Sequence, residues 1–312
     1  MRCSESLIGF FLTWGVTACA TGSVADDTVE TTTAATTASS GVGGNNASSS
    51  SSATTTSTSS GTATSGSGTG GSGQGECGPK ESDIFLISKT NELHRFEPKT
   101  GSLNKIGPLM CPVVGGVTPV SITVDRDEGA WVVYNDGRLY KVSTMSAACT
   151  GSGFVPSQQG FKTFSMAFVA NTPGGSPETL TIANTVGIGT IDVGTLKVTP
   201  HGSFGGSQTL QLTGAAKGAL FGFFPSSSAY LSPIDPQTST LGAHQKLDAI
   251  KTTGTSAFAQ WGGSFWFFTA PIGTSSRIDR YDPVSKLTEP MNPSVGFEII
   301  AAGVSTCATA SP

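Results

Sequence analysis

The chain has 312 residues, of which 12% are charged, and its formal net charge is −4. Its 17 lysines and arginines never form a run, which argues against a nucleic-acid partner because phosphate binding needs a clustered basic face. Residues 20–76 are almost entirely Ser, Thr, Gly and Ala, which excludes a packed core there and leaves about 230 residues for one folded domain.

The first predicted element is a secretory signal peptide over residues 1–18. Its apolar part, Leu7–Ala18, is too short to span a bilayer and is typical of a signal peptide. The letters VTAC that end at Cys19 resemble the bacterial lipoprotein signal, in which the cysteine receives lipid and becomes the new N-terminus. The letters ACA at 18–20 also form an ordinary cleavage site, so simple secretion is the alternative. We expect an exported protein, held at the outer membrane or cell surface by a lipid on Cys19.

Residues 19–76 predict a lipidated N-terminus followed by a disordered stalk. A Ser/Thr/Gly-rich chain of this length reaches roughly 40 Å, from the random-coil relation for flexible linkers. Such a stalk would hold a folded domain clear of a membrane surface.

Four of the six cysteines lie in the predicted folded part, namely Cys77, Cys111, Cys149 and Cys307. An even number of cysteines in an exported chain indicates two disulfides. There is no CxxC motif, and the three histidines lie far from these cysteines in the sequence. The sequence therefore predicts neither a metal site nor a cofactor.

One short pattern recurs five times between Cys77 and Cys307. Each copy is a strand that ends in an apolar residue and is followed by a turn, often with an acidic residue first. The apolar residues recur every 43 to 49 residues, a spacing that matches one blade of a β-propeller: Phe96, Val142, Ile191, Ile234 and Tyr281. The acidic residues are expected to cap the turns between third and fourth strands: Glu97, Asp192, Asp235 and Asp282.

The first repeat lacks the innermost strand that precedes the other four, and a matching strand appears at the far end, in residues 297–303. This displacement predicts a ring that the C-terminal strand closes. We therefore predict an all-β fold, a five-bladed β-propeller over residues 77–307, with a short tail at 308–312. Six blades are the alternative if the segments 108–119 or 147–163 contain further strands. A β-sandwich with similar hairpins is a second alternative.

Closure of the ring would bring the two ends of the domain together. Cys77 precedes the second strand of the first blade, and Cys307 follows its innermost strand. We therefore predict a Cys77–Cys307 disulfide, and Cys111 then pairs with Cys149 by elimination.

The layout resembles secreted bacterial β-propeller lipoproteins of uncharacterised function that carry a Ser/Thr-rich stalk. The resemblance covers residues 77–307 and rests on the strand–turn repeat and the terminal cysteine pair. Because the repeat is generic among propellers, the resemblance implies a fold and not an activity.

The candidate binding residues are those expected at the mouth of the central channel. Asp125 follows the second inner strand, and Glu298 lies on the closing strand. Gln260 and Trp261 follow the fifth inner strand, with Trp261 expected in a turn where it could stack on a sugar. Five-bladed glycosidases use carboxylates that converge on the channel. No catalytic set is predicted here, because matching positions carry no carboxylate: Ser165, Gln211 and Phe258.

These observations favour a non-catalytic binding or scaffold module displayed on a tether. Its partners would be the membrane, through the lipid, and a glycan or a surface protein. One alternative is an extracellular carbohydrate-active hydrolase or lyase with a degenerate propeller site. Another is a structural envelope lipoprotein without a ligand.

Overall fold

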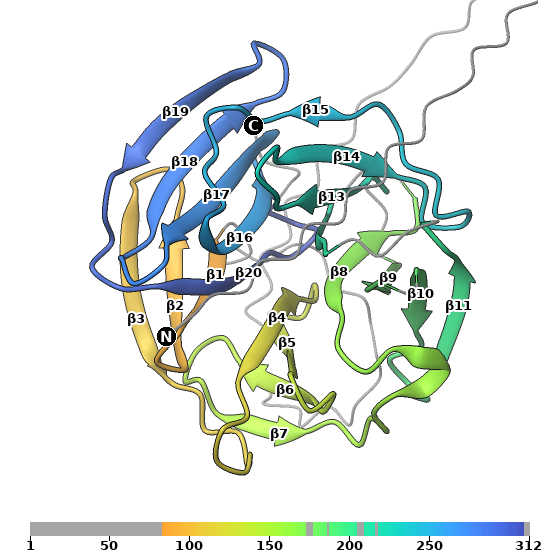
Figure 1. The fold of residues 1–312 in the computed structure, drawn as a ribbon. Coiled ribbons are helices and arrows are strands. Elements are labelled where there is room, and N and C mark those ends of the chain that lie inside the picture. The colour runs from red at the N-terminus through yellow and green to blue at the C-terminus, as the bar shows by residue number, and fades with distance from the viewer. Residues whose placement is uncertain (1–82, 173–176, 186, 205–208, 216–217, 309–312) are drawn as a thin grey trace, which may run out of the picture. The chain divides into compact units, whose positions relative to one another are not determined.

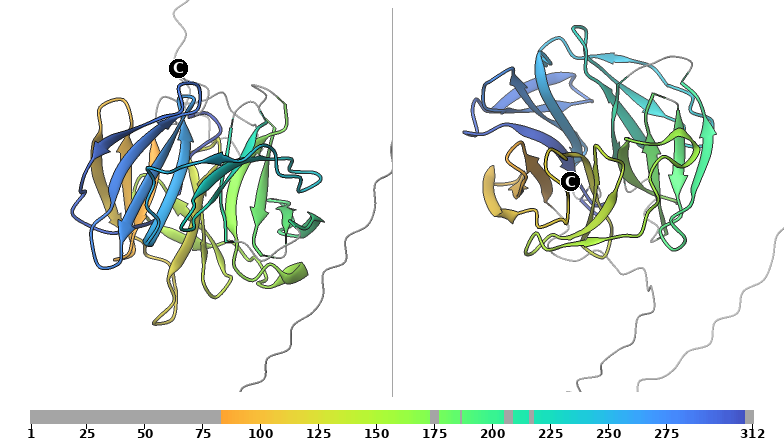
Figure 2. Two further views of the ribbon diagram at one scale, coloured as in Figure 1. Left: turned by 45° about the horizontal axis from the view of Figure 1, so that its top comes forward. Right: turned by 60° about the horizontal axis from the view of Figure 1, so that its bottom comes forward.

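The protein is a five-bladed β-propeller, in which five four-stranded antiparallel sheets surround a central axis (Figure 1). The computed structural model describes residues 83–172, 177–185, 187–204, 209–215 and 218–308. The predicted signal peptide, the lipidation site Cys19, the stalk and Cys77 lie outside the described residues. The strands of each blade run between the two faces of the ring (Figure 2).

Every blade has the same order of strands from the axis outward. Blade 1 consists of β20 (Ile299–Gly303), β1 (Ile84–Ser88), β2 (Glu92–Glu97) and β3 (Ser102–Pro108). Blade 2 consists of β4 (Pro119–Val124), β5 (Gly129–Tyr134), β6 (Leu139–Ser143) and β7 (Cys149–Gly151). Blade 3 consists of β8 (Ser165–Ala170), β9 (Glu178–Ala183), β10 (Ile188–Ile191) and β11 (Val198–Gly202). Blade 4 consists of β12 (Gln211–Gly214), β13 (Leu220–Phe224), β14 (Tyr230–Ile234) and β15 (Gln245–Lys246). Blade 5 consists of β16 (Gly254–Trp261), β17 (Ser264–Pro271), β18 (Arg277–Asp282) and β19 (Leu287–Asn292).

A short 3₁₀ helix, η1 (Gln158–Gly160), lies in the loop that leads from blade 2 to blade 3. In the part of the chain that the structure describes, no helix is long and apolar enough to cross a membrane.

The C-terminal strand β20 closes the ring, as predicted from the displaced repeat. It pairs antiparallel with β1, so that Phe85 lies opposite Gly303 and Ile87 opposite Ala301. It also contacts the inner strands of both neighbouring blades, β16 and β4. The first and last parts of the domain therefore share one sheet (Figure 1).

The core lies between the blades, and successive residues of a strand face opposite neighbours. Ile84 and Leu86 of β1 pack against blade 5, whereas Phe85 and Ile87 pack against blade 2. The same alternation recurs in β5, where Val132 faces blade 1 and Trp131 faces blade 3. Because both faces of each sheet are buried, the second strands are continuous apolar runs and not alternating ones.

Hydroxyl side chains of one inner strand accept hydrogen bonds from the backbone of the next. Ser121 Oγ and Thr123 Oγ1 on β4 accept from the backbone N–H groups of Met166 and Phe168, at 3.1 and 3.2 Å. Further contacts of this type join β8 to β12 and β12 to β16. Neighbouring inner strands therefore run in the same direction, and backbone donors at their edges are satisfied without a shared sheet.

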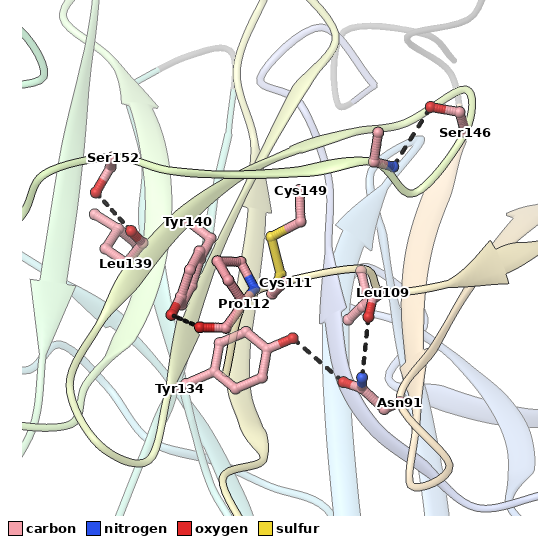
Figure 3. Close-up of a disulfide and its surroundings, with 11 residues drawn as sticks. Asn91, Leu109, Cys111, Pro112, Tyr134, Leu139, Tyr140, Ser146, Cys149 and Ser152 are labelled. Carbon is pink, nitrogen blue, oxygen red and sulfur yellow. Dashed lines mark hydrogen bonds between the residues drawn. A yellow bond between two sulfur atoms is a disulfide. The ribbon is translucent and has the colours of Figure 1, made fainter. Parts of the chain in front are cut away.

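The predicted disulfide between Cys111 and Cys149 is confirmed. It joins the segment after β3 to the first residue of β7, and so ties blade 1 to the outer strand of blade 2 (Figure 3). Tyr140 packs edge-on against Tyr134 close by, and its hydroxyl donates to the carbonyl of Pro112 at 3.4 Å. Cys307 also takes part in a disulfide. Its predicted pairing with Cys77 lies outside the described residues.

The acidic residues of the repeats cap turns, as predicted. Oδ1 of Asp192 accepts from the backbone N–H groups of Gly194 and Thr195 in the β10–β11 turn. Asp235 does the same in the β14–β15 turn. These hydrogen bonds lower the pKa of both carboxyl groups from the ordinary aspartate range. The two aspartates therefore hold blade turns and stay ionised at neutral pH.

Candidate functional site

A cavity of about 550 Å³ lies at the end of the central channel where the inner strands begin. Ser165 and Gln211, the first residues of β8 and β12, line it, as does Ser121 near the start of β4. The loops that precede β8 and β12 contribute further lining residues, among them Phe164 and Leu210. The cavity is therefore built mainly from the first residues of the inner strands and from the connections between blades.

Blades 2, 3 and 4 contribute polar groups to the cavity lining, interspersed with apolar side chains such as Val120 and Leu212. Ser121 Oγ and Ser165 Oγ each accept a backbone N–H from the next inner strand. A serine hydroxyl can also donate one hydrogen bond, and these two acceptor contacts leave both hydroxyl protons available. Two serine hydroxyl groups thus belong to the cavity lining.

Gln211 also belongs to the cavity lining. Its amide nitrogen donates to the backbone carbonyl of Ser256 and, at 3.3 Å, to the Ser256 hydroxyl. A carbonyl can only accept, so this contact requires the nitrogen of Gln211 on that side and leaves Oε1 on the other. Gln211 Oε1 is buried and has no hydrogen-bond partner. Leaving a buried carbonyl oxygen without a donor costs free energy.

Blades 5 and 1 contribute apolar residues to the lining. Phe258 of β16 is 1% exposed and its ring stacks on Phe267 in the core, and three residues of β20 complete this side: Ile300, Ala301 and Ala302. Lys162, which is exposed, is the one charged side chain among the described residues that line the cavity.

Asn184 forms hydrogen bonds that fix one side of the cavity mouth. It follows β9, and its Nδ2 donates to the carbonyls of Gly160 and Thr163 at 3.3 and 3.2 Å. These contacts hold the loop that carries Lys162 and Phe164 against blade 3. The cavity rim in this region is therefore positioned by side chain–backbone hydrogen bonds.

Asp125 lies at the opposite end of the channel from the cavity, directly after β4. Its Oδ1 accepts from the backbone N–H groups of Asp127 and Gly129, and its Oδ2 accepts from Trp131 Nε1 at 3.0 Å. Burial raises the pKa of Asp125 against the opposing effect of these hydrogen bonds. Its visible role is to organise the β4–β5 turn.

Gln260 and Trp261 also lie away from the cavity, at the last two positions of β16. The expectation that Trp261 occupies a turn is wrong. It pairs with Ser264 in the β16–β17 ladder, is 8% exposed and packs edge-on against Trp266. Trp261 belongs to the strand because its side chain is buried, and the turn is formed by the two glycines that follow it. Gln260 Oε1 is buried without a hydrogen-bond partner.

Glu298 is separated from the other three candidates, because it precedes β20 and so lies at the end where the inner strands begin. It forms an ion pair with Lys89 at 2.7 Å. The pair borders a second, smaller hollow between blades 5 and 1 that also includes Thr274 and Phe297. The structure thus brings Asp125, Gln260 and Trp261 to one end of the ring and Glu298 to the other.

The end of the channel opposite the cavity carries a buried polar cluster around the C-terminal segment. Residues 304–308 follow β20 and are buried. Thr306 Oγ1 donates to Glu178 Oε2 at 2.8 Å and accepts from Arg126 Nε at 3.0 Å. Arg126 also donates its backbone N–H to Glu178. Burial raises the pKa of Glu178 to about 7, against these hydrogen bonds. In the described ranges, no group of three His, Cys, Asp or Glu residues is placed to hold a metal ion.

Ser121 was not among the candidate residues, although the repeats hold the signal that finds it. Ser165 and Gln211 open their inner strands, and Ser121 occupies the corresponding position near the start of β4. Aligning the inner strands and selecting polar residues at their starts would have identified all three. A pattern of carboxylates alone does not include them.

No family model and no curated protein matches this chain. Among solved structures, the chain is similar to a protein of unknown function from Bacteroides caccae, with 8% identity and a TM-score of 0.45 over 71% of this chain and 98% of that one. TolB from Acinetobacter baumannii is 11% identical, with a TM-score of 0.41 over 69% of this chain and 54% of that one. A chain of a mitotic checkpoint complex is 10% identical, with a TM-score of 0.39 over 67% of this chain and 62% of that one.

Proposed function

We propose that this protein is an exported, tethered β-propeller that binds a ligand in the cavity at the channel mouth without transforming it. The observation that carries the proposal is the composition of the cavity lining. Hydroxyl and amide groups are interspersed with apolar side chains, and Lys162 is the one titratable side chain among the described lining residues. Such a lining orients and desolvates a ligand. General acid–base catalysis would need a suitably placed pair of titratable groups.

The test is a binding screen on the exported protein with saccharides, organic acids, amino acids and short peptides. Binding is detected as a shift in the unfolding temperature of the protein. A ligand that binds the native state raises that temperature in proportion to the logarithm of its concentration. Mass spectrometry of each bound compound then checks that it is recovered unchanged.

Two variants locate the binding. Thr209→Trp adds bulk at an exposed position of the cavity lining, and Val284→Trp adds the same bulk at a position that is 90% exposed and not among the lining residues. We expect Thr209→Trp to abolish the thermal shift and Val284→Trp to preserve it. Equal binding by both variants would contradict the proposed site, and turnover of a bound sugar would favour the hydrolase alternative.

The proposal places the propeller outside the cell on a lipid-anchored stalk. It is supported by the signal peptide pattern, the cysteine at its end and the length of the Ser/Thr/Gly-rich segment. Replacing Cys19 by Ser should move the protein from the detergent phase to the aqueous phase in phase partitioning, because the acyl chains provide the membrane affinity. Unchanged partitioning would contradict the lipid anchor and leave the ligand-binding proposal untouched.

A further inference from the structure

The chain continues beyond the closing strand β20 as a short segment, residues 304–308, which we call the C-terminal strap. All five of its residues are buried. Val304 and Ala308 pack in the apolar cluster between blades 5 and 1, together with Trp261. Thr306 instead contacts Arg126, which follows β4 of blade 2, and Glu178, which begins β9 of blade 3. Because its contacts come from four blades, the strap lies across the end of the channel opposite the cavity.

The hydroxyl group of Thr306 joins the strap to the ring. It donates to Glu178 Oε2 at 2.8 Å and accepts from Arg126 Nε at 3.0 Å. The other carboxyl oxygen of Glu178 accepts the backbone N–H of Arg126 at 2.9 Å. Thr306 is 1% exposed, and the side chains of Arg126 and Glu178 are each 8% exposed. A hydroxyl, a cation and an acid from three blades thus form one buried cluster.

Glu178 is the member of this cluster whose charge changes near neutral pH. Burial raises its pKa to about 7 and is the largest influence on it. The charged groups that act on this pKa both come from the segment after β4, where Asp125 raises it and Arg126 lowers it. The strap contributes the hydrogen bond from Thr306, which lowers the pKa, and no charged side chain.

Displacement of the strap would admit water to Glu178. Because burial is the largest influence, the pKa of the exposed carboxyl would return toward its ordinary value of 4.5. The closed state then binds this proton more tightly than the opened state does. The contribution of the proton to closure is fully present below pH 4.5 and is lost as the pH rises through about 7. A rise in pH therefore favours opening.

We infer that the C-terminal strap is a pH-sensitive latch, which stays closed while Glu178 carries a proton and loosens when the carboxyl ionises. Cys307 is disulfide-bonded, so the strap is displaced locally and remains attached to the domain. The latch lies at the end of the channel away from the cavity, and it does not depend on the proposed function.

Hydrogen exchange of the strap amides between pH 5 and 8 tests the latch on the full exported protein. The Cys307 N–H donates to Ser305 Oγ at 3.3 Å, and the Ala308 N–H donates to the Ser305 carbonyl at 3.1 Å. Dividing each exchange rate by that of an unstructured chain at the same pH gives the equilibrium constant for opening. We expect this constant to rise at least tenfold from pH 5 to 8. The upper limit is roughly 70-fold if the opened state has a pKa of 4.5.

The amides of β5 separate local opening from global unfolding. Val132 and Val133 are fully buried at the centre of blade 2 and should exchange only when the whole domain unfolds. The strap amides should therefore have a larger opening constant than the β5 amides at every pH. If strap and β5 amides share one opening constant, the strap opens only with the whole domain and the latch is wrong.

Two matched variants assign the pH dependence to one carboxyl group. Glu178→Gln keeps the size of the side chain and cannot ionise, so its opening constant should change less than twofold between pH 5 and 8. Glu289→Gln removes an exposed carboxyl group on β19 and should keep the wild-type dependence. Unfolding temperatures show that each variant is folded. A Glu178→Gln protein with the wild-type pH dependence would overturn the latch.

Thr306→Val gives a second readout that does not require a change at Glu178. It removes the hydroxyl that joins the strap to the ring and should raise the opening constant roughly tenfold at pH 5, the equivalent of one hydrogen bond to a charged group. An opening constant equal to that of wild type would show that this contact does not hold the strap and would overturn the latch. A wild-type opening constant that falls as the pH rises would mean that the ionised carboxylate holds the strap, which also contradicts the inference.

Discussion

Glu178 illustrates how the surroundings of one residue change its chemistry. It begins β9, and its side chain is 8% exposed beside Arg126, whose Nε lies 3.8 Å from Glu178 Oε2. Burial raises the pKa of the carboxyl group to about 7, and the hydrogen bonds from Thr306 and the Arg126 backbone oppose that rise. The nearby Asp125 carboxyl also raises it. For the pKa of Glu178, the effect of desolvation is therefore larger than that of the hydrogen bonds that stabilise the charged carboxylate.

The raised pKa of Glu178 predicts a pH dependence of folding stability. Below pH 4.5 the group is protonated in both states, and its contribution is fully present. As the pH rises toward 7 the unfolded chain releases this proton while the folded chain keeps it, so stability falls, by roughly 3 kcal/mol as an upper bound. Glu178→Gln cannot ionise. Urea unfolding of both proteins from pH 4 to 8 should therefore show wild type losing stability relative to this variant.

The control for this pH series is Glu289→Gln, which removes an exposed carboxyl group on β19. Because every other titrating group is shared, the difference between wild type and each variant isolates one carboxyl. A wild-type curve that runs parallel to that of Glu178→Gln would contradict the raised pKa.

At the residue scale, the sequence identifies chemical groups but not their partners. Asp125 was a candidate binding residue at the channel mouth, yet Trp131 Nε1 and two backbone N–H groups occupy its oxygens. Trp261 was expected in a turn, yet it lies on β16 and packs on Trp266. In both residues the deciding contact comes from the adjacent strand of the same blade, which the sequence pattern does not locate.

At the scale of strands, the hydroxyl contacts between inner strands explain how separate sheets join into a ring. Neighbouring inner strands do not share a ladder. Thr123 is 2% exposed and accepts the Phe168 N–H at 3.2 Å, while Thr213 accepts the Gln260 N–H at 3.0 Å. Each threonine thus satisfies a buried donor of the following blade.

Replacing Thr123 by Val tests this role, because valine keeps the shape and loses the oxygen. The Phe168 N–H would then be buried without a partner, which costs about 1–3 kcal/mol. Urea unfolding should show this loss, and hydrogen exchange at Phe168 should accelerate. Thr123→Ser keeps the acceptor and should preserve most of the exchange protection at Phe168. If Thr123→Val is as stable as wild type, the contact contributes little to the ring.

The strands themselves could be predicted because their burial on both faces leaves a continuous apolar run. Ile84–Ser88 and Ser264–Pro271 can be recognised in the sequence for this reason. In each of the five blades the third strand follows the second, and this pair recurs at the repeat spacing. The sequence marks the polar residues at the starts of the inner strands, but it does not show that they border a cavity, because the shape of the cavity depends on how the blades pack around the axis.

At the scale of the whole molecule, the ring is held where its first and last described strands meet. β20 pairs with β1, and the chain then continues through buried residues to Cys307, which is disulfide-bonded. The Cys111–Cys149 bond closes 38 residues within the first two blades. A bond from Cys307 to Cys77 would instead enclose the whole domain, so that the blade built from both ends could not open.

The last prediction concerns this seam. A non-reducing peptide map should recover Cys77 joined to Cys307, and Cys307→Ser should lower the free energy of unfolding by about 5 kcal/mol, because closing so long a loop removes much entropy from the unfolded chain. The Cys111→Ser, Cys149→Ser double variant is the control, and its smaller loop predicts a loss of about 4 kcal/mol. Since opening the seam frees β20 from β1, Cys307→Ser should also expose the β20 amides to hydrogen exchange, whereas the control should leave them protected. A peptide map that joins Cys307 to Cys3 or Cys19 would contradict the seam disulfide and leave the five-bladed ring, which rests on strand pairing, in place.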